Sequence, residues 1–186
     1  QGEGGLDAET LDQRVGAVLP TVAQRAAVAA LGARATWDPL GSPKVLTRDD
    51  AEFLSEALPG SPADAARAFV RRHAVVFGLS EGQTSADQLE LIKAVPLTEG
   101  PQARKMMARE SVDWSDNAHV VSFRQRYAGR PAAIDGQLTV ALDKDNRVGF
   151  VSSSVTSQTQ VTNTARISMV DAYLAAVPQP ARERLE

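Results

Sequence analysis

Two histidines, His73 and His119, are the side chains of this 186-residue chain best suited to acid–base or metal chemistry. His73 lies on an apolar helical stripe, where an imidazole could serve as a metal ligand or a general base. No histidine, cysteine or carboxylate lies three or four residues after it, at the positions that share its helix face. We therefore expect a half-buried structural histidine bonded to a backbone or side-chain acceptor. His119 is expected at the start of a strand, and two histidines without a placed carboxylate make a poor zinc site.

Carboxylates occur in two short groups with suggestive spacing. Asp113 and Asp116 could be taken for an acid–base couple, but they lie in a turn-rich connection, and we expect a solvated loop. Asp143 begins an Asp-x-Asp-Asn pattern that is similar to the start of a calcium loop. Such a loop requires glycine at its sixth position and glutamate at its twelfth, and here these positions hold Val148 and Ser154. The pattern therefore favours a hairpin turn.

The usual catalytic signatures are missing from the sequence. It contains no His-Glu-x-x-His zinc motif, no Gly-x-Ser-x-Gly elbow, no phosphate loop and no dinucleotide fingerprint. Because it has no cysteine, disulfides, thiolate metal ligands and a cysteine nucleophile are excluded. A formal net charge of −3 gives no basic field for nucleic acid, and no apolar run reaches the length of a membrane span. We expect a segment that is not itself an enzyme.

The order of helical and strand-like patterns predicts an α+β fold. The best helix runs from Pro62 to Phe77, because Ser61 can cap its start and Gly78 can end it. A twisted antiparallel sheet, with strands near 88–97, 119–127, 136–143 and 147–155, should pack on this helix, with N-terminal helices alongside. The expected core consists of Phe69, Val70, Phe77, Leu91, Val121, Phe123, Leu138, Val140 and Leu142.

Composition and pattern divide the chain into four parts. We expect a helical segment at 1–34, an extended segment followed by a short helix at 35–60, an α+β core at 61–157, and a linker with a C-terminal helix at 158–186. In the core, strand alternation predicts a solvent-exposed position for the polar residues Gln125, Arg126, Asp135 and Asp143. The outer sheet face and its free edge are where we expect a partner to bind.

Three segments, in a consistent order, resemble the pro-regions of fungalysin- and thermolysin-type zinc metallopeptidases. The helix Ala65–Leu79 is similar to the helix of those pro-regions. The signature Phe123-x-Gln125-x-Tyr127-x-Gly129-x-Pro131, followed by Gly136-x-Leu138-x-Val140 and a turn from Asp143 to Arg147, resembles the strands of their FTP domain. The upstream Trp37-x-Pro39-x-Gly41-x-Pro43 is similar to the segment that precedes this domain. The motif residues, structural or docking, are then Trp37, Gly41, Pro43, Phe69, Gly78, Phe123, Gln125, Tyr127, Gly129, Pro131, Gly136 and Asp143.

Two further features bear on this resemblance. The pair Ala132-Ala133 stands where such pro-regions often have a bulky apolar pair, which bears on local packing. The run that begins at Ser168, after Ile167, resembles the opening helix of a PepSY-type domain, which commonly follows an FTP domain.

The resemblance implies a propeptide domain of a secreted bacterial fungalysin-like zinc metallopeptidase, exported through a signal peptide that is not in this sequence. Such a domain acts as an intramolecular folding helper and an inhibitor of the zymogen by docking on the catalytic domain, its partner. Zinc is expected only in that downstream domain, so no cofactor is expected in this segment. The alternative is a stand-alone secreted or cell-envelope protein-binding module with the same fold. The sequence indicates neither the docking residues nor the oligomeric state.

Overall fold

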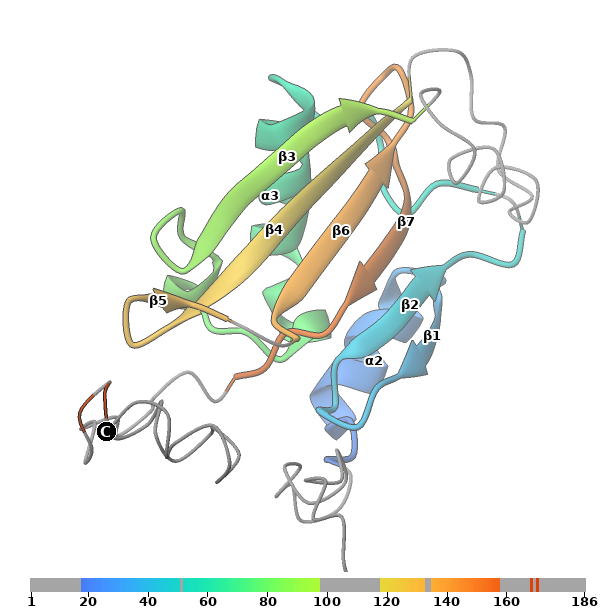
Figure 1. The fold of residues 1–186 in the computed structure, drawn as a ribbon. Coiled ribbons are helices and arrows are strands. Elements are labelled where there is room, and N and C mark those ends of the chain that lie inside the picture. The colour runs from blue at the N-terminus through green and yellow to red at the C-terminus, as the bar shows by residue number, and fades with distance from the viewer. Residues whose placement is uncertain are drawn as a thin grey trace, which may run out of the picture.

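The computed structural model describes residues 18–50, 52–97, 118–132, 135–157, 168 and 170. Within these residues, seven strands form one open, twisted antiparallel sheet in the order β1-β2-β7-β6-β4-β3, with β5 paired to the end of β4 (Figure 1). The strands are β1 (Arg34–Trp37), β2 (Pro43–Thr47), β3 (Leu89–Pro96), β4 (His119–Tyr127), β5 (Arg130–Pro131), β6 (Gln137–Leu142) and β7 (Val148–Ser153). The helices are α2 (Val22–Ala30), α3 (Pro62–Arg72) and the 3-10 helices η1 (Ala74–Phe77) and η2 (Gly82–Thr84). The α+β class is therefore confirmed.

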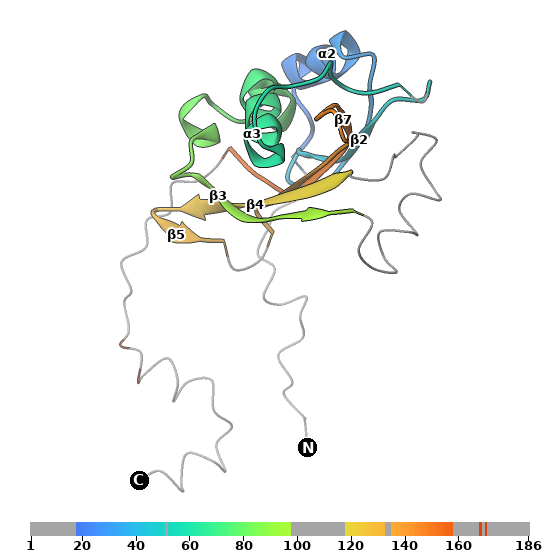
Figure 2. The same cartoon turned by 90° about the horizontal axis from the view of Figure 1, so that it is seen from above.

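Both α-helices lie on the same side of the sheet, and no described helix lies on the other side of β3 and β4 (Figure 2). Alternate strand residues point toward the helices, which gives the sheet one apolar face. Eight of the predicted core residues are at most 1% exposed: Phe69, Val70, Phe77, Val121, Phe123, Leu138, Val140 and Leu142. This buried layer holds α3 against β4 and β6.

The start of α3 is fixed by a capping box. Ser61 Oγ accepts a hydrogen bond from the Asp64 amide at 3.2 Å, and the Asp64 carboxylate accepts one from the Ser61 amide at 3.2 Å. Pro62 at the first helical position adds a fixed φ angle where no amide donor is needed. The predicted helix start is confirmed.

The predicted end of this helix is wrong by one turn. The α-helix ends at Arg72, and η1 carries the chain onward to Gly78, which adopts the left-handed conformation with φ of 66°. The Leu79 amide then bonds back to the Ala74 carbonyl at 2.9 Å. The tightened last turn and the stop at Gly78 place Leu79 in the core at 5% exposure.

Leu91 was predicted in the core and is instead 44% exposed. It lies on β3, which is the last strand of the sheet, and the register shifts between Leu91 and Lys93. A bulge of this kind bends and twists an edge strand. Leu91 itself pairs with Phe123 ahead of the bulge, and it is exposed because no described strand lies beyond β3.

The extended segment predicted from residue 35 forms the hairpin of β1 and β2, and Leu46 of β2 pairs with Val151 of β7. Residues 34–47 thus belong to the same sheet as the predicted core segment. Trp37 packs, partly buried, against the main core.

The short helix predicted from Arg48 to Leu58 is wrong. Its described residues form turns and bends. Leu54 donates its amide hydrogen to the Val148 carbonyl at 2.6 Å, and Ser55 Oγ accepts a hydrogen bond from the Val148 amide at 3.0 Å. These bonds attach the segment to the start of β7, and the first of them uses the Leu54 amide, which a helix would have paired internally.

Three predictions lie outside the described residues. They are the first helix before residue 18, the connection that carries Asp113 and Asp116, and the C-terminal helix, of which only residues 168 and 170 are described. Among the described helices, none is long and apolar enough to cross a membrane.

Candidate functional site

Three motif residues of β4, Phe123, Gln125 and Tyr127, point to the helix side of the sheet. Phe123 is 1% exposed, and the Arg67 guanidinium of α3 lies 4.8 Å from the centroid of its ring. Such stacking lets the long arginine side chain cover an aromatic ring while its charge stays near water. Half-burial lowers the pKa of Arg67, and the charge of Asp64 opposes that shift. The first residue of the strand signature therefore anchors α3 to the sheet.

Gln125 is fully buried, contrary to the solvent-exposed position that the sequence suggested. Its Nε2 donates a hydrogen bond to the Thr156 carbonyl at 2.6 Å, and its Oε1 accepts one from the Thr156 amide at 2.9 Å. Tyr127 Oη donates to the same Oε1 at 3.3 Å. A buried carboxamide requires partners for both of its ends, and the backbone of residue 156 supplies them.

Residues 154–157, which follow β7, are called the exit segment. Its last residue, Ser157, is held by a second glutamine. Gln83, in η2, donates from Nε2 to the Ser157 carbonyl at 2.8 Å, and its Oε1 accepts the Ser80 amide hydrogen at 2.8 Å. We call Gln83, Gln125, Tyr127, Thr156 and Ser157 the exit clamp, because they fix the chain after β7. Gln83 was not predicted, because a glutamine in a polar loop carries no distinguishing signal.

The glycine and proline of the strand signature shape the turn beside this clamp. Ala128 and Gly129 have φ angles of 48° and 77°, which produce the tight return from β4 to β5. Pro131 pairs with Arg126 across that turn. Gly129 and Pro131 therefore shape the turn between β4 and β5.

Gly136 lies against the clamp in the left-handed conformation, with φ of 65°. A Cβ atom at this position would lie 2.7 Å from the Ala132 Cβ and 3.1 Å from Tyr127 Oη. Ala132 is 4% exposed, so the small side chain after the proline is buried beneath the glycine. The departure from a bulky apolar pair therefore suits the close approach of Gly136.

Asp143 is also buried, at 1% exposure, although a solvent-exposed position was expected. Its Oδ1 accepts the amide hydrogens of Asp145 and Arg147 at 3.0 and 2.8 Å, and its Oδ2 accepts two bonds from the Arg147 guanidinium at 2.8 and 2.6 Å. The same guanidinium lies 4.1 Å from the centroid of the Phe53 ring. The hydrogen bonds that the Arg147 guanidinium donates to Asp143 raise the pKa of Arg147. Both oxygens of Asp143 thus close the predicted β6–β7 hairpin.

Two other motif glycines, Gly41 and Gly78, meet at the buried side chain of Gln24 from α2. Gln24 Nε2 donates to the Gly41 carbonyl at 2.8 Å, and a Cβ at Gly78 would lie 3.2 Å from that nitrogen. A groove of about 300 Å³ runs beside them, lined in part by Thr156 and Ser157 of the exit clamp. Gln24 was not predicted, although its position three residues after Thr21 is a capping-box signal: its Oε1 accepts the Thr21 amide hydrogen at 2.9 Å, and Thr21 Oγ1 accepts the Gln24 amide hydrogen at 3.1 Å.

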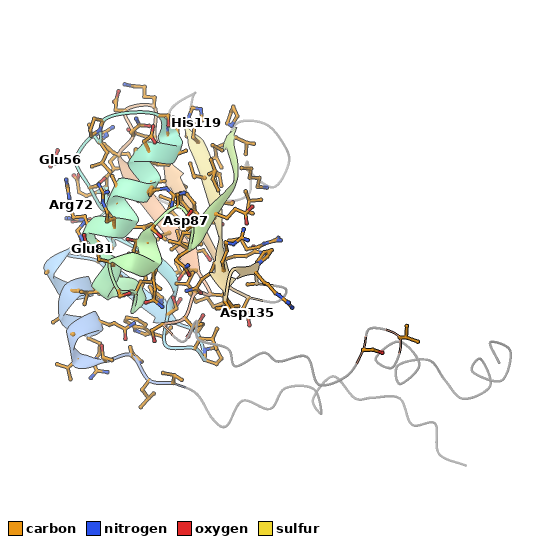
Figure 3. All side chains as sticks on the ribbon, turned by 90° about the vertical axis from the view of Figure 1, so that its left-hand side faces the viewer. Glu56, Arg72, Glu81, Asp87, His119 and Asp135 are labelled. Carbon is orange, nitrogen blue, oxygen red and sulfur yellow. The ribbon has the colours of Figure 1, made fainter. Side chains whose placement is uncertain are left out.

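The two histidines remain apart from these clusters. His73 is half-buried at the end of α3, with its ring centroid 4.7 Å from that of Phe69, and burial followed by the Arg72 charge lowers its pKa. His119 lies at the start of β4, at the opposite end of the sheet from Asp135 (Figure 3). Among the described residues, no group of three or more histidine, cysteine or carboxylate side chains could hold a metal ion. The buried polar residues bind backbone groups and neighbouring side chains, whereas the buried Asp38 Oδ2 has no hydrogen-bond partner among the described residues.

The most accessible apolar groups of the sheet lie on β3. Leu91, Ile92 and Val95 are 44%, 46% and 39% exposed. On the adjacent strand β4, Arg124 and Arg126 are partly buried on the face that no described helix covers. Arg126 pairs with Glu90 of β3 at 2.9 Å. This edge and the face beside it are the part of the described sheet best suited to contact another protein.

Comparisons with protein-family models, with curated proteins and with solved structures found no match for this chain.

Proposed function

We propose that this chain is the non-catalytic pro-region of a secreted zinc metallopeptidase, which assists the folding of the catalytic domain and inhibits it by docking. The observation that carries the proposal is the β3 edge, where Leu91, Ile92 and Val95 are exposed together on one strand. An exposed apolar edge strand is a liability in an isolated protein, and it is a recurring surface for recognition of another chain. Zinc belongs to the catalytic domain in this proposal, because it is the partner that performs the chemistry.

The motif residues support the proposal through what they do in the fold. Phe123 packs under α3, Gln125 and Tyr127 hold the exit segment, and Asp143 closes a hairpin. Each of these residues has a structural role, and the polar side-chain atoms of Gln125, Tyr127 and Asp143 are engaged in hydrogen bonds. A rigid scaffold that presents an edge is what a folding helper requires, because binding energy is lost when the docking surface must first become ordered.

The proposal is tested with the peptidase domain encoded downstream in the same precursor. That region is expected to contain His-Glu-x-x-His, and the purified chain added in trans should slow peptide hydrolysis and raise the refolding yield of the denatured catalytic domain. Undiminished hydrolysis at micromolar chain, together with an unchanged refolding yield, would overturn the proposal.

A matched pair of variants places the docking surface. Ile92→Asp puts a charge at an exposed position of the β3 edge, and we expect it to weaken both inhibition and refolding assistance. Val75→Asp introduces the same charge on η1, where Val75 is 52% exposed on the helix side, and should leave both unchanged. Equal losses in the two variants would contradict docking at the edge.

The alternative, a stand-alone secreted or cell-envelope protein-binding module, rests on the same edge. It is favoured over the pro-region if the downstream sequence lacks a zinc motif while the chain still captures a protein partner through β3.

A further inference from the structure

In the described sheet, the backbone of β3 is paired on one side only, with β4. Arg126 of β4 donates its amide hydrogen to the Gln88 carbonyl at 2.9 Å, and Glu90 is paired with Arg124. Backbone groups of an antiparallel strand alternate between its two sides. Leu91 and, beyond the bulge, Ala94 therefore turn their amide and carbonyl groups away from β4, where an added strand could pair with them.

The side chains beside this edge are predominantly basic. Directly paired residues share a face, so Glu90 with Arg124 and Lys93 with Ser122 lie on the face that no described helix covers. Arg126 lies two residues from Arg124, and thus on that face as well. Glu90 is engaged by Arg126, whereas Lys93 and Arg124 make no ion pair with any described residue.

This local excess of positive charge contrasts with the formal net charge of −3 for the whole chain. Asp87, the nearest preceding carboxylate, lies between β3 and α3 in Figure 3, toward the helix side of the sheet. The charge on the uncovered face therefore favours a partner that brings carboxylates to that face.

We infer that β3 accepts an extended acidic segment of the partner, which joins the sheet as an added edge strand. This inference rests on the proposed docking function and adds the chemistry of the segment. Main-chain hydrogen bonds to Leu91 and Ala94 supply sequence-independent affinity. Aspartate or glutamate opposite Lys93 and Arg124, with apolar residues at the alternate positions and near Val95, supplies selectivity.

The probe is a library of random seven-residue peptides, selected on the immobilised whole chain. We expect enriched peptides to alternate acidic with apolar residues. Enrichment without acidic residues, or no enrichment, overturns the inference.

Variants distinguish the strand edge from simple charge attraction. Ala94→Pro removes an outward amide hydrogen and keeps the β4 ladder, so selected peptides should bind it about tenfold more weakly. Val95→Pro removes an amide that donates to β4, and it provides the reference for damage to the fold in urea unfolding.

Arg124→Glu should weaken peptide binding. Arg71→Glu, an equal charge change at an exposed position of α3, should leave peptide binding unchanged. Equal binding to the wild type and Ala94→Pro contradicts strand addition, and equal effects of the two arginine variants contradict the acidic preference.

The same variants separate this inference from the proposed function. If Ala94→Pro and Arg124→Glu inhibit the peptidase as well as the wild type does, the inference fails and the pro-region function stands. If acidic peptides bind at the edge but the chain affects neither hydrolysis nor refolding, the pro-region function fails and the strand-accepting edge stands.

Discussion

The carboxamide of Gln125 makes a reciprocal pair of hydrogen bonds with the backbone of Thr156, at 2.6 Å to its carbonyl and 2.9 Å from its amide. The side chain thereby pairs with both backbone groups of Thr156, as a neighbouring strand would do. Because Gln125 is fully buried, the pair ties the path of the exit segment to the interior of the sheet. The chain after β7 is therefore held in a defined position up to Ser157.

Gln125→Leu should lower the free energy of unfolding by about 1–3 kcal/mol, because it keeps the volume and removes both bonds to Thr156. Hydrogen exchange at the Thr156 amide should accelerate. Urea unfolding and exchange mass spectrometry measure the two effects. The control is Gln137→Leu at the exposed first position of β6, which should change stability by less than about 0.5 kcal/mol. Equal effects of the two variants would mean that the buried pair contributes nothing specific.

Gly136→Ala and Gly129→Ala separate backbone strain from steric clash. Both glycines have positive φ, at 65° and 77°, so each substitution should cost about 1–2 kcal/mol in conformational strain. Only Gly136 has a close neighbour, the Ala132 Cβ at 2.7 Å from the added carbon, whereas nothing lies within 4 Å at Gly129. Thermal denaturation should therefore rank Gly136→Ala as clearly the less stable variant, and the reverse order would contradict the close packing around the clamp.

His73 should make stability depend on pH. Burial lowers the folded-state pKa of His73 below its ordinary value of 6.5, so the folded state binds the proton more weakly than the unfolded chain does. This component of stability is complete above pH 6.5, declines as pH falls, and levels off below the folded-state pKa. The difference in unfolding free energy between the wild type and His73→Gln should follow that curve. A difference that is constant between pH 8 and pH 4 would contradict it.

Phe69→Ala should cost about 3–5 kcal/mol of stability, because it removes a 1% exposed aromatic ring between α3 and the sheet. Leu91→Ala is the comparison, since Leu91 is 44% exposed on β3 and should cost less than about 1 kcal/mol. Urea unfolding at constant pH gives both values. A large cost at Leu91 would imply that the edge strand is covered in solution.

Local patterns of the sequence were sufficient for most elements. Strand alternation predicted β4 at His119–Tyr127, and the serine–proline signature predicted the start of α3. The left-handed stop at Gly78 also followed from its residue type. These features depend on neighbouring residues only, through side-chain periodicity and the φ preferences of glycine and proline.

Features that join distant parts of the chain were not predictable. Gln125 and Asp143 look like solvent-facing polar residues, and each is buried because a segment elsewhere, or the far side of a turn, supplies its partners. Leu91 looks like a core residue and is exposed because no described strand lies beyond β3. The sequence by itself determined where α3 and the strands β3, β4, β6 and β7 begin, to within one residue. The tertiary structure decided which polar groups are paired and which edge is left open, because a buried hydrogen bond and a sheet position depend on segments brought together only by folding.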